Sequence, residues 1–228
     1  MKRSAEAGEK EERFFVRRGG LRMTGVSGGC DEIDLGRDVM MRVIAGKFGR
    51  RKLKGPGKLR MRPTSDRLRE TLFNILGPAV EDSLFVDLYA GTGAIGIEAI
   101  SRGAKEVVLV EEHAASARLI QENLKALGAS TGTAEVMAVP AAKALEELAA
   151  RHRMADFVFL DPPYKDQEER LLVLEFLDES HLLAPQGLVI VEHSSKVELP
   201  KRFMRLERMR VVEQGDAALS FYCLAAAA

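Results

Sequence analysis

Residues 83–100, SLFVDLYAGTGAIGIEAI, pass from a strand-like run into a helix-like run through a glycine-rich turn. The glycines follow the spacing GxGxxG, at Gly91, Gly93 and Gly96. Glycine lets backbone approach a ligand there and lets a helix begin close to the strand. Asp87 and Tyr89 stand four and two residues before the first glycine. A carboxylate at that point repels a pyrophosphate and suits a cationic ligand. The stretch therefore favours S-adenosylmethionine, which has a sulfonium and an ammonium group, over a nicotinamide cofactor.

On both sides of this turn, short apolar runs alternate with helical patterns. The predicted strands are residues 83–90, 106–111, 134–139, 155–161 and 187–194. The predicted helices lie near residues 94–102, 114–127, 141–151 and 168–180. A further helix is predicted before the first of these strands: Thr64 or Ser65 can cap it, its apolar stripe is Leu68, Leu72, Ile75 and Leu76, and Gly77-Pro78 ends it. Strands rich in Val, Ile and Leu that alternate with helices predict an α/β fold with a doubly wound, mostly parallel sheet. Residues 203–224 instead predict two antiparallel strands joined near Gly215.

The second strand ends at an acid, Glu111, twenty residues after Gly91. An acid at this position binds ribose hydroxyls in nucleotide-binding folds of this type. The adjacent Glu112 is a rival for the same role, and both could instead be solvated residues at a strand end. We expect Glu111 to contact the cofactor.

A second motif, FVFLDPPY at residues 157–164, ends the fourth strand with an acid, two prolines and an aromatic ring. Parallel strands deliver ligand-binding groups at their carboxyl ends, so Asp161 should lie near the glycine-rich turn. Pro162 and Pro163 fix the backbone, which holds the Asp161 carboxylate and the Pro162 carbonyl as two rigid acceptors. Tyr164 offers a face on which a nucleobase can stack. This set suits methylation of an exocyclic amino group, because two acceptors stabilise the charge that develops on nitrogen. A plain strand-ending turn capped by Asp161 is the alternative.

The formal net charge of zero conceals a strongly basic segment. Residues 42–69 carry eleven Lys and Arg side chains against one acid, Asp66, whereas residues 70–228 carry fifteen bases and twenty-five acids. This segregation favours a polyanionic partner for the basic segment, with a solvated charged surface as the alternative. The two cysteines, Cys30 and Cys223, have no metal-ligand spacing and predict free thiols in a reducing compartment. No apolar run reaches the roughly 18 residues of a membrane span.

The two motifs together resemble the class I S-adenosylmethionine-dependent amino-methyltransferases. The preceding RVIAGKFGRRKL and LRMRPTSDRLRETLFNIL make residues 41–224 resemble the bacterial family that methylates the N2 amino group of a guanine in 16S ribosomal RNA. The resemblance implies a seven-stranded sheet with a C-terminal antiparallel hairpin and a small N-terminal β-hairpin that holds RNA. It further implies that S-adenosylmethionine is bound by Asp87, Tyr89, Gly91, Gly93 and Glu111. Arg67 is a candidate partner for the carboxylate of the cofactor, with an RNA contact or a solvated helix residue as the alternatives. Such enzymes usually place Asp or Asn after the third strand to bind adenine, but this chain has Pro140 or Ala141 there.

The resemblance assigns the flipped guanine to Asp161, Pro162, Pro163 and Tyr164. The expected RNA contacts are Arg42, Lys47, Arg50, Arg51, Lys52, Arg60 and Arg62. We divide the chain into a poorly ordered extension at 1–40, a basic β-hairpin and loop at 41–62, and a methyltransferase domain at 63–228. Met41 is a candidate start of the physiological protein.

The expected enzyme is a cytoplasmic monomer without a metal that produces N2-methylguanine and S-adenosylhomocysteine. Its partner is 16S ribosomal RNA within an assembling small subunit. The alternatives are an amino-methyltransferase for DNA adenine or another RNA, a protein amide methyltransferase, and a non-catalytic RNA-binding assembly factor. A nicotinamide-dependent oxidoreductase is more distant, because it leaves the DPPY motif unexplained.

Overall fold

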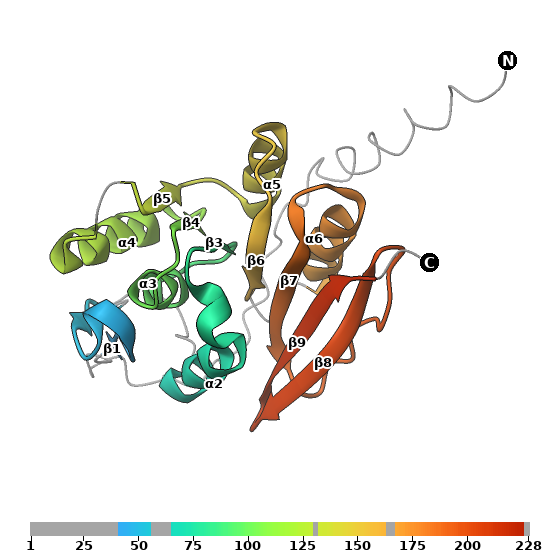
Figure 1. Cartoon of the computed structure of the whole chain (residues 1–228), viewed down its shortest axis with the longest axis horizontal. Helices are drawn as coiled ribbons and strands as arrows, with labels where there is room; N and C mark the ends of the chain where they lie inside the picture. Colours follow the sequence, from blue (N-terminus) through green and yellow to red (C-terminus); the bar gives the residue numbers. More distant parts are fainter. Residues whose placement is uncertain (1–40, 56–64, 130–131, 163–166, 226–228) are drawn as a thin grey trace, which may run out of the picture. The chain divides into compact units, whose positions relative to one another are not determined.

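The computed structural model describes residues 41–55, 65–129, 132–162 and 167–225. The predicted extension at 1–40 lies outside these ranges. The described part is built on one seven-stranded sheet (Figure 1). Its strands are β3 (Leu84–Asp87), β4 (Glu106–Val110), β5 (Ala134–Met137), β6 (Ala155–Leu160), β7 (Leu183–Ser194), β8 (Leu206–Gln214) and β9 (Ala217–Leu224). The strand order is β5-β4-β3-β6-β7-β9-β8.

The five strands from β3 to β7 are parallel, and β9 pairs antiparallel with both β7 and β8. The sheet therefore confirms the predicted class: mostly parallel, doubly wound, with a C-terminal antiparallel hairpin. Strand β7 begins at Leu183, earlier than the predicted residue 187, and the β6–β7 register shifts between Ala155 and Phe157. The order reverses at β3 and β6, so the carboxyl ends of these neighbours form the crevice where such sheets bind ligands.

Helices cover both faces of the sheet (Figure 1). They are α2 (Asp66–Leu76), α3 (Ala94–Ser101), α4 (Ala114–Leu127), α5 (Ala141–Ala150) and α6 (Gln167–Glu179). One apolar core joins α2, α3 and α4 to strand residues such as Phe85 and Phe157. The other core joins α5 and α6 to the strand residues that alternate with these, such as Val86 and Val158. Because side chains alternate along a strand, the near-continuous apolar runs fill both cores. Within the described ranges, no helix is both long and apolar enough to span a membrane.

Helix α2 begins as its sequence predicts. The Ser65 side chain accepts a hydrogen bond from the Leu68 amide at 3.1 Å, an N-cap that satisfies a free helix donor. Leu68, Leu72 and Leu76 of the predicted stripe are buried. The alternative cap, Thr64, lies outside the described residues. Gly77 ends α2, and the chain continues in a short 3₁₀ helix, η2 (Gly77–Val80).

A small N-terminal hairpin precedes the sheet, as predicted. It consists of β1 (Met41–Arg42), the 3₁₀ turn η1 (Gly46–Phe48) and β2 (Lys52–Leu53), with β1 and β2 antiparallel. We call residues 41–55 the basic hairpin. Its apolar side chains are buried in the core shared with α2, α3 and α4: Met41, Val43, Phe48 and Leu53. Gly46 has φ 78°, and a Cβ there would lie 1.9 Å from the Ser101 carbonyl oxygen, so the hairpin packs directly on the end of α3.

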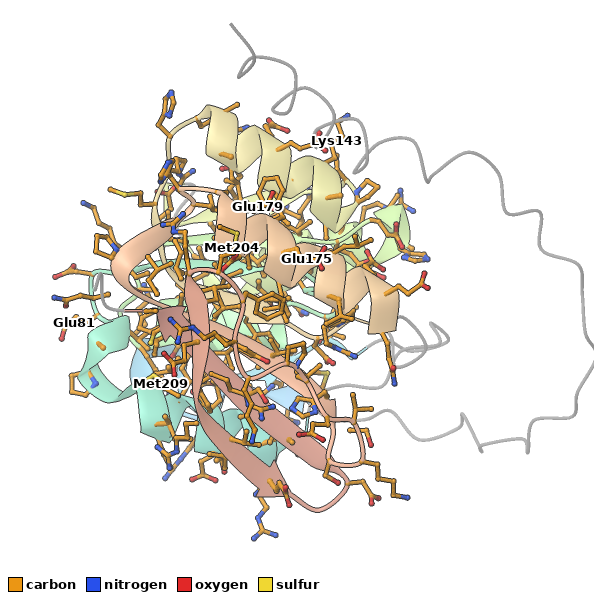
Figure 2. All side chains as sticks on the ribbon, turned by 90° about the vertical axis from the view of Figure 1, so that its right-hand side faces the viewer. Glu81, Lys143, Glu175, Glu179, Met204 and Met209 are labelled. Carbon is orange, nitrogen blue, oxygen red and sulfur yellow. The ribbon has the colours of Figure 1, made fainter. Side chains whose placement is uncertain are left out.

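The C-terminal hairpin, formed by β8 and β9, occupies the edge of the sheet opposite β5. Figure 2 views the molecule from the side on which Met204 and Met209 are displayed, together with Glu175 and Glu179 of α6. Met204 is 80% exposed and Met209 63% exposed. Strand β8 has a register shift between Arg208 and Arg210. Such an irregularity on an edge strand discourages pairing with another chain.

Candidate active site

Three carboxylates meet at the carboxyl edge of the sheet. Asp87 ends β3, Glu111 follows β4, and Asp161 follows β6. The parallel register sets Asp87 beside Leu109 and Phe159, each two residues before one of the other two acids. Both Asp161 and Glu111 act on Asp87 electrostatically and raise its pKa. The structure therefore brings together the three acids that the sequence assigned to cofactor and target base.

Asp87 is the most buried of the three, with 1% of its surface exposed. Its Oδ2 accepts a hydrogen bond from the Gly96 amide at 3.3 Å. Among the described residues, Oδ1 is buried and makes no hydrogen bond of standard geometry, although the Tyr89 backbone amide also acts on this carboxylate and lowers its pKa. Burial raises the pKa of Asp87 to about 7, the Gly96 amide opposes this, and the neighbouring Asp161 raises it further. A cationic group placed against Oδ1 would satisfy this acceptor and favour the ionised carboxylate.

Glu111 fastens the glycine-rich turn. Its Oε2 accepts from the Gly91 amide at 2.9 Å, and its Oε1 accepts from the His113 amide at 2.9 Å. Only 10% of its side chain is exposed, against 59% for the rival Glu112. A carboxylate has lone pairs for additional donors, so Glu111 can hold both the turn and a ribose hydroxyl. Burial favours Glu111 over Glu112.

Two glycines of the turn are required by backbone conformation or packing. Gly93 precedes α3 with φ 79°, a conformation that other residues rarely adopt. A Cβ on Gly96 would lie 2.7 Å from the Leu109 side chain of β4. The third glycine therefore lets α3 pack closely on the sheet, and this places the first turn of the helix against Asp87.

The described part of the DPPY motif is Asp161 and Pro162. Asp161 is half-buried at the sheet edge, and Pro162 is buried. Leu160, the last residue of β6, pairs with Val191 of β7. Asp161 follows it and therefore lies at the carboxyl end of β6, the strand between β3 and β7. Pro163 and Tyr164 lie outside the described residues, and their assignment stays a prediction.

Two other residues predicted to bind the cofactor differ in how far they are buried. Tyr89 is half-buried and packs against the core formed with α5 and α6. Arg67 is exposed on the first turn of α2. Pro140 and Ala141, at the start of α5, offer no side-chain acceptor for adenine. In the described part of the chain, no group of three His, Cys, Asp or Glu side chains could hold a metal ion.

The predicted RNA contacts in the basic hairpin are all exposed: Arg42, Lys47, Arg50, Arg51 and Lys52. Arg51 has a structural task as well, because its guanidinium donates to the carbonyls of Ala126 and Leu127 at the end of α4. Arg42 forms a 3.6 Å ion pair with Asp66. Arg60 and Arg62 lie outside the described residues.

Four buried polar side chains that attach the basic hairpin to the body were missed by sequence reasoning, and one of them, Arg69 of α2, donates to the Arg42 carbonyl at 2.6 Å. Glu98 of α3 accepts from the amides of Ile44 at 2.7 Å and Ala45 at 3.0 Å. Ser101 accepts from the Phe48 amide at 2.9 Å, and Asn123 of α4 bonds to Lys54. The available signal was their place within apolar patterns: Glu98 interrupts the apolar run of α3, and Asn123 lies in the Ile120, Leu124 and Leu127 stripe.

Known proteins are similar to this chain in sequence and in fold. The family model described as Conserved hypothetical protein 95 matches residues 41–223. Ribosomal RNA small subunit methyltransferase D of Escherichia coli (strain K12) is 38% identical over 70% of this chain and 78% of its own length. YlbH of Bacillus subtilis is 36% identical over 80% of this chain and 98% of its own length. The solved structure of yhhF from Escherichia coli matches with a TM-score of 0.68 and 32% identity, over 82% of this chain and 99% of that one. The chain therefore belongs to the Conserved hypothetical protein 95 family, together with ribosomal RNA small subunit methyltransferase D.

Proposed function

We propose that the chain transfers a methyl group from S-adenosylmethionine to the exocyclic N2 amino group of a guanine in small-subunit ribosomal RNA. The products are N2-methylguanine and S-adenosylhomocysteine. The observation that carries the proposal is the meeting of Asp87, Glu111 and Asp161 at the switch point of the sheet. The family membership supports the substrate, since a relative is named as a ribosomal RNA small subunit methyltransferase.

The cofactor end of the site is formed by strand ends and the glycine turn. Asp87 offers a buried acceptor that makes no hydrogen bond of standard geometry in the described structure, which fits an ammonium or sulfonium group. Glu111 holds the turn through Gly91 and retains acceptor capacity for a ribose hydroxyl. When bound, S-adenosylmethionine supplies an electrophilic methyl group. Asp87 and Glu111 would hold the cofactor, and the methyl group that it supplies would go to the target amine.

The target amine is activated by acceptors. The Asp161 carboxylate and the Pro162 carbonyl accept hydrogen bonds from its two N–H groups, which draws the nitrogen lone pair out of conjugation with the ring. Because positive charge develops on nitrogen during transfer, a fixed carboxylate stabilises the transition state more than the ground state. The nitrogen loses a proton to solvent after it has become cationic, so no strong base acts before the transfer. The guanine must leave its stack to reach this pocket, and Tyr164 is the residue expected to stack on it.

The basic hairpin holds the RNA backbone. Phosphate contacts give affinity without base selection, so the choice of guanine belongs to the pocket after β6. We propose that the substrate is an assembling small subunit and that the enzyme is a cytoplasmic monomer.

The experiment that tests this function is a methyl-transfer assay followed by nucleoside analysis. Small-subunit particles from cells that lack the enzyme are incubated with tritiated S-adenosylmethionine, and the RNA is digested to nucleosides. We expect the label in N2-methylguanosine. Label in another nucleoside would point to a different acceptor. Absence of label on particles, naked RNA and DNA, together with retained RNA binding, would favour a non-catalytic assembly factor.

A further inference from the structure

The basic hairpin and the glycine turn are joined by the side chain of a single residue, Asn123 of α4. Its Oδ1 accepts from the Lys54 amide at 2.8 Å, and its Nδ2 donates to the Lys54 carbonyl at 3.2 Å. The same Nδ2 donates to the carbonyl of Thr92, between Gly91 and Gly93, at 3.3 Å. Asn123 is 1% exposed. One amide group thus bonds both to the end of the RNA-binding hairpin and to the cofactor-binding turn.

The three bonds determine which way the amide points. The carboxamide oxygen faces an N–H group, and both amide hydrogens face carbonyl oxygens. A flipped amide would oppose a donor to a donor and an acceptor to two acceptors. The side chain is therefore fully satisfied in one orientation, and any movement of Thr92 or Lys54 breaks a buried hydrogen bond.

Each of the other side chains that anchor the hairpin joins it to one helix: Arg69 of α2 donates to the Arg42 carbonyl at 2.6 Å. Glu98 and Ser101 bond to the 44–48 backbone from α3. Arg51 bonds to the last carbonyls of α4. In the described structure, Asn123 alone among these five side chains also bonds to the backbone of the glycine turn. It holds the hairpin at its exit, Lys54, where the chain leaves β2.

We propose that Asn123 is a positioning residue that couples the glycine turn to the exit of the basic hairpin, so that cofactor binding orders the RNA-binding hairpin. The inference rests on the proposed function for the identity of the two ligands. A cofactor that holds the turn still also holds the Thr92 carbonyl, and through Asn123 it stabilises the Lys54 backbone. RNA carried by the hairpin is then held in fixed register with the methyl donor.

Two substitutions separate coupling from folding. Asn123→Ala removes all three bonds. Asn123→Asp keeps the acceptor for the Lys54 amide and removes the donors to Thr92 and Lys54, so it cuts the link to the turn in a side chain of the same shape. The matched control is Glu122→Gln on the same helix, which removes the 2.7 Å ion pair between Glu122 and the Lys54 side chain and leaves the Asn123 bonds in place. Thermal melting of each variant reports folding.

Turnover on small-subunit particles gives a first readout. We expect Asn123→Asp to lower kcat by about tenfold with the KM for S-adenosylmethionine within about twofold of the parent, because misplacement of reactants affects the chemical step. Glu122→Gln should retain the parental kcat. A kcat within about twofold of the parent in both Asn123 variants would contradict a positioning role.

Amide hydrogen exchange, with and without S-adenosylhomocysteine and without RNA, is the closing test. In the parent and in Glu122→Gln, the ligand should slow exchange at least about threefold both in the turn (residues 91–97) and at the hairpin exit (residues 50–54). In the two Asn123 variants the turn should still respond and the hairpin exit should not. An equal response of the hairpin exit in the variants, or a parental response confined to the turn, would overturn this inference alone. A parent that responds in neither segment would overturn the proposed function together with the inference.

Discussion

The basic hairpin holds its cations in solvent, whereas the carboxyl edge of the sheet removes its acids from solvent. Lys47 and Lys52 are exposed, while Asp87 is buried with an oxygen that makes no hydrogen bond of standard geometry in the described structure. Exposed charge is screened and acts on any polyanion nearby. Buried charge is costly unless a ligand pairs with it. We therefore expect the hairpin to supply affinity for RNA and the edge to supply chemistry, and four changes test that division.

Asp161→Ala should have the largest effect. Removal of the carboxylate that we propose accepts a hydrogen bond from the target amine should lower the rate of methyl transfer by at least about 100-fold, the scale found when a transition-state hydrogen-bond partner is removed. RNA affinity should stay within about twofold of the parent, since phosphate contacts dominate it. Tritium transfer and filter binding measure the two quantities. Substantial turnover by this variant would remove Asp161 from the site.

Asp87→Asn should stabilise the ligand-free protein at high pH. Because burial raises the pKa of Asp87 from 3.8 to about 7, its contribution to stability is present below pH 4 and is lost as the pH rises through about 7. The shift corresponds to at most about 4 kcal/mol. We therefore expect the variant to melt higher than the parent at pH 8, with little difference at pH 4.

The same substitution should weaken binding of S-adenosylmethionine, most clearly at pH 8, where the parental carboxylate is ionised. Calorimetry at pH 6 and pH 8 measures this. A melting temperature lower than that of the parent at both pH 4 and pH 8, with unchanged cofactor affinity, would contradict the assignment of Asp87.

Charge reversal in the basic hairpin should have an intermediate effect. Lys47→Glu with Lys52→Glu should weaken RNA binding by roughly tenfold or more at low salt, with a smaller difference at high salt. Arg51 is left intact because its side chain also bonds to α4. Filter binding over a salt series measures the change, and calorimetry should find the affinity for S-adenosylhomocysteine unaltered.

The smallest effect is expected from the same charge reversal in and beside the C-terminal hairpin, where Arg210 lies in β8 and Arg202 forms an isolated β-bridge with Glu207 of β8. Arg202 and Arg210 are exposed at the far edge of the sheet, on the part of the chain with the acidic excess. Arg202→Glu with Arg210→Glu should change RNA affinity by less than about threefold, the limit we set for a charge outside the binding surface. A loss as large as that of the basic-hairpin variant would show that RNA binding follows total charge and not the hairpin.

Sequence reasoning located the strand ends and missed the attachments between segments. Asp87, Glu111 and Asp161 were predictable because each ends an apolar run, and parallel strands end at one edge. The bonds of Glu98 and Asn123 to the hairpin were not, because they join positions 53 to 54 and 69 residues apart. Arg51 had the same charge pattern as its neighbours, so its bond to the end of α4 required the tertiary structure.

The most direct test of the division between hairpin and edge is the single-turnover rate of methyl transfer at saturating small-subunit particles. We expect the Lys47→Glu, Lys52→Glu variant to reach a rate within about twofold of the parent once RNA saturates it, whereas Asp161→Ala should stay at least about 100-fold slower. A basic-hairpin variant that remains slow at saturation, or an Asp161→Ala variant that reaches the parental rate, would contradict the division between hairpin and edge.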